Sequence, residues 1–133
     1  MCSSDLNSAD MVTSITNELG YTSSMAWDDL DRQTSVTDAL GNVSSVVYNA
    51  GGLATSKTDA LGNTTDYEFN SRNWLTKTKM PDPDGSGSLS RTEVTYGYDA
   101  SGNMTSQGSP TYTSAITKTY DDAGRLKIGR AHV

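Results

Sequence analysis

The sequence predicts an all-β fold: a repeat array of antiparallel β-hairpins that forms a twisted, curved open sheet. Three observations lead to this prediction. The hexapeptide TDALGN occurs at residues 37–42 and again at residues 58–63, about 21 residues later. Turn-forming residues recur every ten or eleven residues. The segments between them are rich in Thr, Val, Tyr and Ser, which favour short strands, so two strands make one repeat.

Each predicted turn is marked by Asp or Asn followed three residues later by Gly, Asn or Asp. An Asp or Asn in the first position can accept a hydrogen bond from the backbone two residues on. The fourth position is left-handed, where Gly costs nothing and Asn or Asp is best tolerated. The rule is not met near Ser109–Pro110. It predicts turns at residues 17–20, 28–31, 38–41, 49–52, 59–62, 70–73, 82–85, 99–102 and 121–124.

The first elements are expected to be strands. Asn7–Leu19 is the best helical candidate because Met11, Val12 and Ile15 are apolar, but its many Ser and Thr residues disfavour a helix. Farther along, apolar and polar residues alternate incompletely in the strand at residues 43–48. Both faces of the sheet are therefore expected to be only partly buried.

The clearest hairpin pairs residues 64–69 with residues 74–79. Strand alternation places Asp66 and Glu68 on one face, where the returning strand brings its two lysines, Lys77 and Lys79, opposite them.

Aromatic residues also gather near this hairpin. We expect Phe69 and Trp74 to form a cross-strand pair. Tyr67, Trp74, Tyr96 and Tyr98 could form a strip that binds sugars, although aromatic residues at strand spacing more often pack across strands.

The two ends look foreign to the repeat. Codons ATC GGA AGA GCA CAC GTC would encode the C-terminal tail, and their reverse complement encodes Asp-Val-Cys-Ser-Ser-Asp, which matches the N-terminal head if GTG is the start codon. This string resembles a widely used sequencing adapter, whose neighbouring codons fit Leu6 and Lys127. We therefore expect residues 1–6 and 127–133 to be adapter-derived rather than native, and residues 7–126 to be a partial repeat array.

Composition limits the function. The lone cysteine, Cys2, and the lone histidine, His132, lie in the suspect ends, so no native thiol or imidazole chemistry is expected. A net charge of −6 argues against a nucleic-acid partner. With 34% hydrophobic and 8% aromatic residues, a large core is not expected. No apolar run approaches the roughly 18 residues of a membrane span.

Two further patterns have competing interpretations. Residues 82–87, DPDGSG, resemble the start of a calcium loop, but the acidic ligand that should follow is missing before Glu93, so an enlarged turn is the preferred interpretation. Asn42, Asn63 and Asn103 begin glycosylation sequons, yet each directly follows a turn glycine, so the repeat generates these matches by itself.

The turns alternate with aromatic residues in a recognisable way. An aromatic residue precedes Asp or Asn in five units, at residues 27–28, 48–49, 69–70, 98–99 and 120–121. Residues 98–104 and 120–126 are close to the YDxxGRL signature, and TDALGN is similar to a second turn of the same repeat. Over residues 16–126 the chain thus resembles the YD-repeat, or Rhs-repeat, family of bacterial Rhs toxins, Tc toxin shell components and teneurins.

The resemblance implies a segment of a β-spiral shell around a toxin or effector domain absent here. It implies a secreted or cell-surface location, and neighbouring repeats and an encapsulated toxin domain as partners. The family's self-cleaving region has paired Asp-Pro motifs, whereas this chain has one at Asp82–Pro83.

We therefore expect a structural, non-enzymatic segment, with no catalytic, cofactor-binding or metal-binding residues and no cofactor. A nucleophilic serine would need a partner base, and no Ser-x-x-Lys or Gly-x-Ser-x-Gly pattern supplies one. The alternative is a carbohydrate- or receptor-binding β-repeat module. Cut sheet edges should make the fragment self-associate.

Overall fold

The computed structural model describes residues 2–85, 89–109 and 112–127, which contain strands and turns but no helix. In chain order the strands are β1 (Ser3–Leu6), β2 (Val12–Thr16), β3 (Thr22–Trp27), β4 (Gln33–Thr37), β5 (Val43–Tyr48), β6 (Ala54–Thr58), β7 (Thr64–Phe69), β8 (Leu75–Lys79), β9 (Glu93–Tyr98), β10 (Met104–Ser109), β11 (Tyr112–Thr117), β12 (Thr119–Tyr120) and β13 (Leu126–Lys127).

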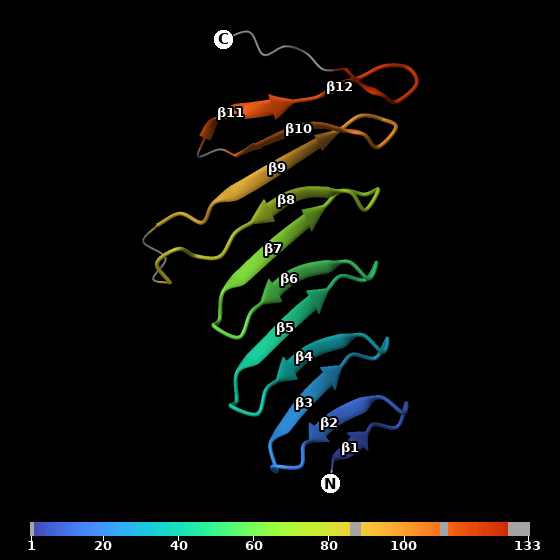
Figure 1. Cartoon of the computed structure of the whole chain (residues 1–133). Coiled ribbons are helices and arrows are strands. Elements are labelled where there is room, and N and C mark those ends of the chain that lie inside the picture. Colours follow the sequence, from blue (N-terminus) through green and yellow to red (C-terminus); the bar gives the residue numbers. More distant parts are fainter. Residues whose placement is uncertain (1, 86–88, 110–111, 128–133) are drawn as a thin grey trace. The chain divides into compact units, whose positions relative to one another are not determined.

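The chain divides into two compact units, residues 1–65 and 66–133. In the first unit, β1 to β6 each pair antiparallel with the next strand in the chain (Figure 1). In the second unit, β7 to β11 do the same, and β12 and β13 form a separate hairpin. The sheet stays open, with its strands in chain order. The predicted all-β array of antiparallel hairpins is confirmed, and β2 lies where a helix was considered.

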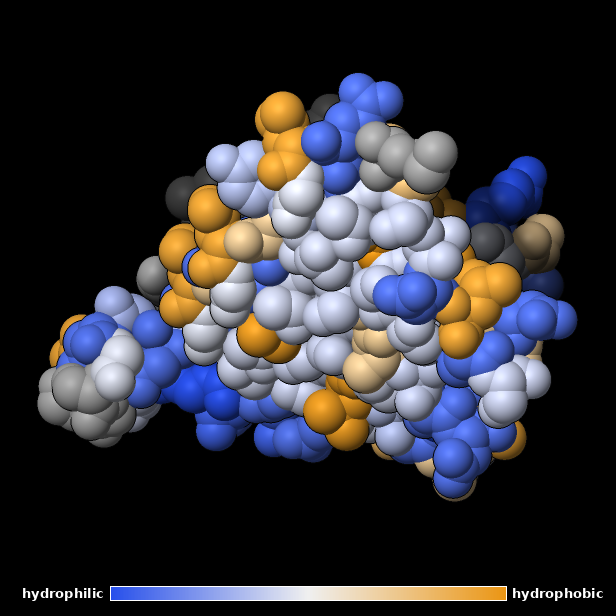
Figure 2. Space-filling view, turned by 90° about the horizontal axis from the view of Figure 1, so that it is seen from below, coloured by the Kyte–Doolittle hydropathy of each residue, from blue (hydrophilic) through white to orange (hydrophobic). Residues whose placement is uncertain are grey.

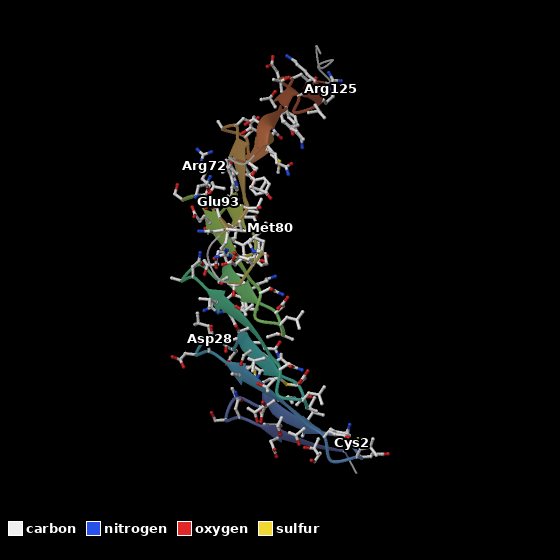
Figure 3. All side chains as sticks on the ribbon, turned by 90° about the vertical axis from the view of Figure 1, so that its left-hand side faces the viewer. Cys2, Asp28, Arg72, Met80, Glu93 and Arg125 are labelled. Atoms are coloured by element: carbon white, nitrogen blue, oxygen red, sulfur yellow. The ribbon has the colours of Figure 1, made fainter. Side chains whose placement is uncertain are left out.

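The described residues form no buried core. None of the described residues is fully buried, polar or apolar. Side chains project from both faces (Figure 3), and hydrophobic residues reach the surface in separate patches (Figure 2). The expectation that both faces are only partly buried is confirmed. Ladder hydrogen bonds and local turn contacts must therefore hold this fold more than a core does.

The predicted turns are confirmed by the backbone. The fourth residue of each has a positive φ, for example 86° at Gly41, 60° at Asp31 and 63° at Asn73. One turn was missed, although it obeys the same rule: Asn7 is followed by Asp10, whose φ is 60°. Pro110, near which the turn rule is not met, lies outside the described residues.

Nine of these turns, all except residues 82–85, fall into two classes at opposite ends of the strands. We call residues 17–20, 38–41 and 59–62 the A-turns; strand pairing continues beside the first two without a shift, as with Thr37 opposite Val43. We call residues 7–10, 28–31, 49–52, 70–73, 99–102 and 121–124 the B-turns. The first five B-turns are followed by a register shift that leaves one residue of the returning strand without a ladder partner.

The unpaired residue of each shift is a threonine. The five are Thr13, Thr34, Thr55, Thr76 and Thr105. In three of these bulges the threonine Oγ1 donates back to a backbone carbonyl of the facing strand, over 3.2 Å to Asp5, 3.3 Å to Val47 and 3.1 Å to Glu68. Each such bulge therefore carries its own hydrogen bond in place of the missing ladder contact.

The hairpin of β7 and β8 confirms one expectation and corrects another. Glu68 lies opposite Lys77 as predicted, and Asp66 lies opposite Lys79. The predicted pair of Phe69 and Trp74 is wrong, because Phe69 is registered with Leu75. Trp74 is the last residue of the connecting loop, whose backbone is closed by the Asn70 N–H donating to the Trp74 carbonyl at 2.9 Å.

Candidate functional site

The turn aspartates each accept several hydrogen bonds within their own turns. In the first TDALGN copy, Asp38 Oδ1 accepts from the N–H groups of Leu40 (2.8 Å) and Asn42 (2.9 Å). Its Oδ2 accepts from the Asn42 side-chain amide at 2.8 Å. Asp59 repeats this arrangement with Leu61 and Asn63. In both copies of the hexapeptide the Asp and Asn side chains close the same turn, which explains why these two residues are repeated.

These contacts change the acidity of the turn carboxyls. The side-chain amide of Asn42, followed by backbone N–H donors, lowers the pKa of Asp38 below its ordinary 3.8. Four other turn carboxyls have lowered pKa values for the same kind of reason. The main donor is the side chain of Arg32 for Asp28, of Asn63 for Asp59 and of Asn103 for Asp99. For Asp121 the main donor is the backbone N–H of Arg125, followed by its side chain. All five carboxylates are thus charged at neutral pH and committed to their own turns.

The sequon asparagines are committed to the same turns. The side-chain nitrogens of Asn42, Asn63 and Asn103 donate to the carboxylates of their turns at 2.8, 2.9 and 2.9 Å. That nitrogen is the atom to which a glycan would be joined. The contacts support the interpretation that the repeat, rather than glycosylation, accounts for these motifs.

The aromatic residues before the B-turns connect successive repeats. In three cases the ring N–H or O–H donates to a backbone carbonyl at the start of the strand after the preceding B-turn. These contacts run from Trp27 Nε1 to Val12 O (2.8 Å), from Tyr48 Oη to Gln33 O (3.2 Å) and from Tyr120 Oη to Met104 O (2.9 Å). The aromatic position therefore joins repeats by a hydrogen bond as well as by packing.

Arg32 adds a second connection in the first unit. It forms an ion pair with Asp28 at 2.7 Å and donates through Nη1 to the carbonyl of Asn49 in the next B-turn at 3.1 Å. Its guanidinium also lies 4.6 Å from the centre of the Tyr48 ring. One side chain thus contacts its own turn, the next turn and the next aromatic ring.

The candidate sugar-binding strip is engaged in packing where the structure gives its contacts. The rings of Trp74 and Tyr98 lie 5.4 Å apart at 45°. The guanidinium of Arg72 lies 5.1 Å from the Trp74 ring centre. A Cβ on Gly102 would lie 3.0 Å from the indole, so the backbone approaches Trp74 closely there. These contacts favour cross-strand packing over a free sugar platform.

Charged side chains form a ladder across β7, β8 and β9. Lys77 Nζ lies 3.3 Å from Glu68 and 3.8 Å from Glu93, and Lys79 Nζ lies 3.7 Å from Glu93, which is marked in Figure 3. Opposite charges that alternate across neighbouring strands favour one register over slipped ones.

The long connection between β8 and β9 is closed at its base. Arg91 donates to the carbonyls of Met80 (2.6 Å) and Lys79 (3.2 Å) and pairs with Asp66 at 2.6 Å. The Met80 N–H donates to the Thr92 carbonyl at 2.8 Å. These contacts close the base of the connection, of which residues 86–88 lie outside the described residues.

The calcium interpretation of this connection gains no support from its described part. Asp82 Oδ1 accepts from the Asp84 N–H at 3.2 Å, and Asp84 Oδ2 accepts from the Leu89 N–H at 3.2 Å. Across residues 2–85, 89–109 and 112–127 no three His, Cys, Asp or Glu side chains are grouped to hold a metal. Part of the candidate loop, residues 86–87, lies outside the described residues.

The remaining candidates are quickly placed. Cys2 is exposed and free, and His132 lies outside the described residues. Among the residues that the structure describes, no helix has the length and apolar character needed to cross a bilayer.

Comparison with known proteins agrees with the fold. A family model described as RHS Repeat matches residues 7–43 and 48–86, more than half of the chain. No curated protein sequence matches this chain.

Solved structures of Tc toxin complexes resemble the chain. A Photorhabdus luminescens Tc holotoxin pore with a TccC3 mutation matches with a TM-score of 0.67 and 19% identity, over 94% of this chain and 6% of that chain. The crystal structure of TcdB2-TccC3-TEV matches with 0.71 and 19%, over 94% and 7%. That of TcdB2-TccC3 without its hypervariable C-terminal region matches with 0.68 and 19%, over 94% and 6%. The chain spans only a small part of these much longer chains, with which it shares its fold.

The repeating turns and the aromatic links recur at intervals of about 21 residues, and the family model matches residues 7–43 and 48–86, where several of these repeats lie. The chain therefore belongs to the RHS repeat family.

Proposed function

We propose that this chain is a structural, non-catalytic segment of a larger RHS-repeat protein, to which it contributes β-hairpins of a wall. One observation carries the proposal. The side chains that could have served chemistry, above all the turn aspartates, are engaged in closing turns and joining repeats. A repeat built in this way is stabilised by contacts with its neighbours in the array.

The wall would surround a toxin or effector domain of the parent protein, which would be secreted or displayed at a cell surface. Membership in the RHS repeat family and the shared fold with Tc toxin complexes support this setting. The partners of the segment would then be neighbouring repeats and the enclosed domain. No catalytic, metal or cofactor residue is assigned.

The native part of the array would be residues 7–126, between the two adapter-like ends. The test is long-read sequencing of the source DNA through both ends of the coding segment. The proposal expects RHS repeats to continue beyond Asn7 and Leu126 toward a different terminal domain. A native gene that encodes residues 1–133 and nothing more would contradict it.

A second experiment tests the wall itself. The parent protein would be expressed intact and with residues 7–126 deleted, and both would be treated with protease. We expect the terminal domain to be protected in the intact protein and digested in the deletion variant. Equal protection of that domain in both proteins would refute a wall function.

A further inference from the structure

The connection between β8 and β9 contains a dipeptide that occurs nowhere else in the chain. Asp84 is followed directly by Gly85, whereas no other Asp or Asn of the 133-residue sequence precedes a glycine. The turn motif places its glycine three residues after Asp, so in both TDALGN copies the residue after Asp is alanine. An aspartate carboxyl reacts most readily with the backbone nitrogen of a following glycine, because glycine has no Cβ to shield that nitrogen.

The structure leaves room for this reaction at the backbone nitrogen of Gly85. Both residues of the dipeptide are exposed, in a connection that extends away from β8 and β9 (Figure 1). Gly85 has a φ of 62°, and a Cβ added to it would meet no atom within 4 Å. No residue that the structure describes accepts a hydrogen bond from the Gly85 N–H. The contact from the Leu89 N–H to Asp84 Oδ2, at 3.2 Å, does not occupy this nitrogen.

The carboxyls of the A-turns are held against the same reaction. Asp59 Oδ1 accepts from the N–H groups of Leu61 and Asn63 at 2.9 Å each, and its Oδ2 accepts from the Asn63 side-chain amide at 2.9 Å. To reach the Ala60 nitrogen, the Asp59 carboxyl would have to give up these hydrogen bonds. The same donors lower the pKa of Asp59 and favour its charged form, whereas ring closure consumes the protonated carboxyl.

We propose that Asp84–Gly85 is a modification site at which aspartate isomerises spontaneously to isoaspartate. The Gly85 nitrogen attacks Cγ of Asp84 and forms a C–N bond, while the carboxyl hydroxyl and the Gly85 amide proton leave as water. The product is a five-membered succinimide ring. Water then opens the ring at one of its two carbonyls. Opening at Cγ restores aspartate, whereas opening at the former backbone carbonyl leaves the chain linked through the side chain, with a free α-carboxylate.

The contacts at the base of the connection confine the effect of this change. Isoaspartate adds one carbon atom to the backbone between residues 84 and 85. Arg91 donates to the Met80 carbonyl and pairs with Asp66, and the Met80 N–H donates to the Thr92 carbonyl. The added carbon lies outside these contacts, so the register of β8 and β9 is expected to persist.

The first test ages the whole chain at neutral pH and physiological temperature for several weeks. Trypsin releases residues 80–91, and liquid chromatography with mass spectrometry follows them. We expect a second peptide of identical mass that increases with time. A carboxyl methyltransferase specific for isoaspartate should label it with methyl groups from S-adenosylmethionine. Asp82 cannot account for this peptide, because Pro83 has no N–H to lose in ring closure.

Two variants identify the reacting atoms. Asp84→Glu keeps the charge but moves the carboxyl one carbon farther away, so the five-membered ring cannot form and no second peptide should appear. Gly85→Ala should slow the reaction several-fold, because its Cβ shields the nitrogen. A single peptide throughout ageing of the original chain, or a second peptide that grows equally in Asp84→Glu, would overturn the proposal.

A third variant separates the role of the structure from that of the sequence. Ala60→Gly places an Asp–Gly dipeptide in the second TDALGN turn, where Asp59 keeps its hydrogen bonds. In the folded chain Asp59 should isomerise several-fold more slowly than Asp84, and in guanidinium chloride the two rates should become similar. Equal rates in the folded chain would show that the fold does not select Asp84. Thermal melts of aged and fresh protein should coincide, and a lower Tm after ageing would contradict the confinement of the change to the loop.

Discussion

At the scale of the residue, a turn depends on two complementary choices. Asp or Asn in the first position satisfies the backbone N–H groups that the turn leaves open, as Asp38 does for Leu40 and Asn42. Gly in the fourth position takes the left-handed conformation at no steric cost, with φ of 86° at Gly41. Where the chain uses Asp31 or Asn73 instead, it uses the side chains best tolerated in that region.

At Gly41 the free-energy cost of the left-handed backbone conformation can be measured without a steric clash, because a Cβ added there would meet no atom within 4 Å. We expect Gly41→Ala to lower the free energy of unfolding by about 1–2 kcal/mol, the cost of a left-handed L-residue. Gly41→Asn should cost clearly less. Urea unfolding followed by circular dichroism measures both variants. Equal losses for Ala and Asn would show that space rather than backbone conformation limits this position.

The hydroxyl of Tyr48 provides a test of the link between repeats. Tyr48→Phe removes the donor to the Gln33 carbonyl but keeps the ring beside Arg32. We expect a loss of about 1 kcal/mol in unfolding free energy, the usual net contribution of one hydrogen bond. Tyr21→Phe is the control, since Tyr21 is 55% exposed. If the two variants lose the same amount, the hydroxyl of Tyr48 does not join the repeats.

At the scale of the element, the B-turn bulge distinguishes the two ends of each strand pair. The extra threonine returns a hydrogen bond to the facing strand, as Thr55 does to the Val47 carbonyl at 3.3 Å. A β-branched residue also suits the extended backbone on either side. The bulge is therefore a built feature of the repeat rather than an irregularity.

Thr55 and Thr34 form a natural comparison, because both are bulge residues. We expect Thr55→Val to lose about 0.5–1.5 kcal/mol of unfolding free energy with its hydrogen bond. Thr34→Val should lose less, because among the described residues the structure gives no hydrogen bond from the Thr34 hydroxyl. Both swaps preserve shape and β-branching, so chemical denaturation of the two variants isolates the hydroxyl. A larger loss at Thr34 would contradict this role.

How far the sequence predicts the elements depends on whether the signal is local. The turns follow from the chemistry of residues three apart, and they were predicted. The pairing of Phe69 with Leu75 does not follow in this way, because a symmetric turn would pair Phe69 with Trp74, whereas the loop extends through Trp74. The bulges had a readable signal, since Thr13, Thr34, Thr55 and Thr76 recur at intervals of 21 residues. Links such as that from Trp27 to Val12 join residues distant in sequence and needed the structure.

At the scale of the whole molecule, the charge of the chain is unevenly divided. Residues 1–65 contain eight Asp and Glu against two Lys and Arg, whereas residues 66–133 contain eight of each. The first unit therefore carries the entire net charge of −6. The described residues of this unit form no buried core that could offset the repulsion between its acidic groups. The turns reduce this repulsion by placing carboxylates beside backbone N–H donors.

Acid stability follows from the same turns. The five turn carboxyls have folded pKa values below their ordinary 3.8, because amide, guanidinium and backbone donors favour the charged form. A group whose pKa is lowered by folding stabilises the fold above its unfolded pKa, and this stabilisation is lost as the pH falls through the folded value. We therefore expect Tm to change little between about pH 7 and 5 and to fall below about pH 4.

The chain supplies its own control for this prediction, since Asn17, Asn49 and Asn70 occupy the first turn position without an ionisable group. The double variant Asp38→Asn/Asp59→Asn keeps an oxygen that can accept the turn hydrogen bonds but removes two of the titrating carboxyls. Its Tm should be lower than that of the original chain at pH 7 and should fall less steeply below about pH 4. Thermal melts of both proteins from pH 7 to about pH 2 measure this difference. If the Tm of both proteins falls equally steeply below about pH 4, the turn carboxyls do not set the acid stability of the array. The loss of Tm must then come from charges elsewhere on the strands.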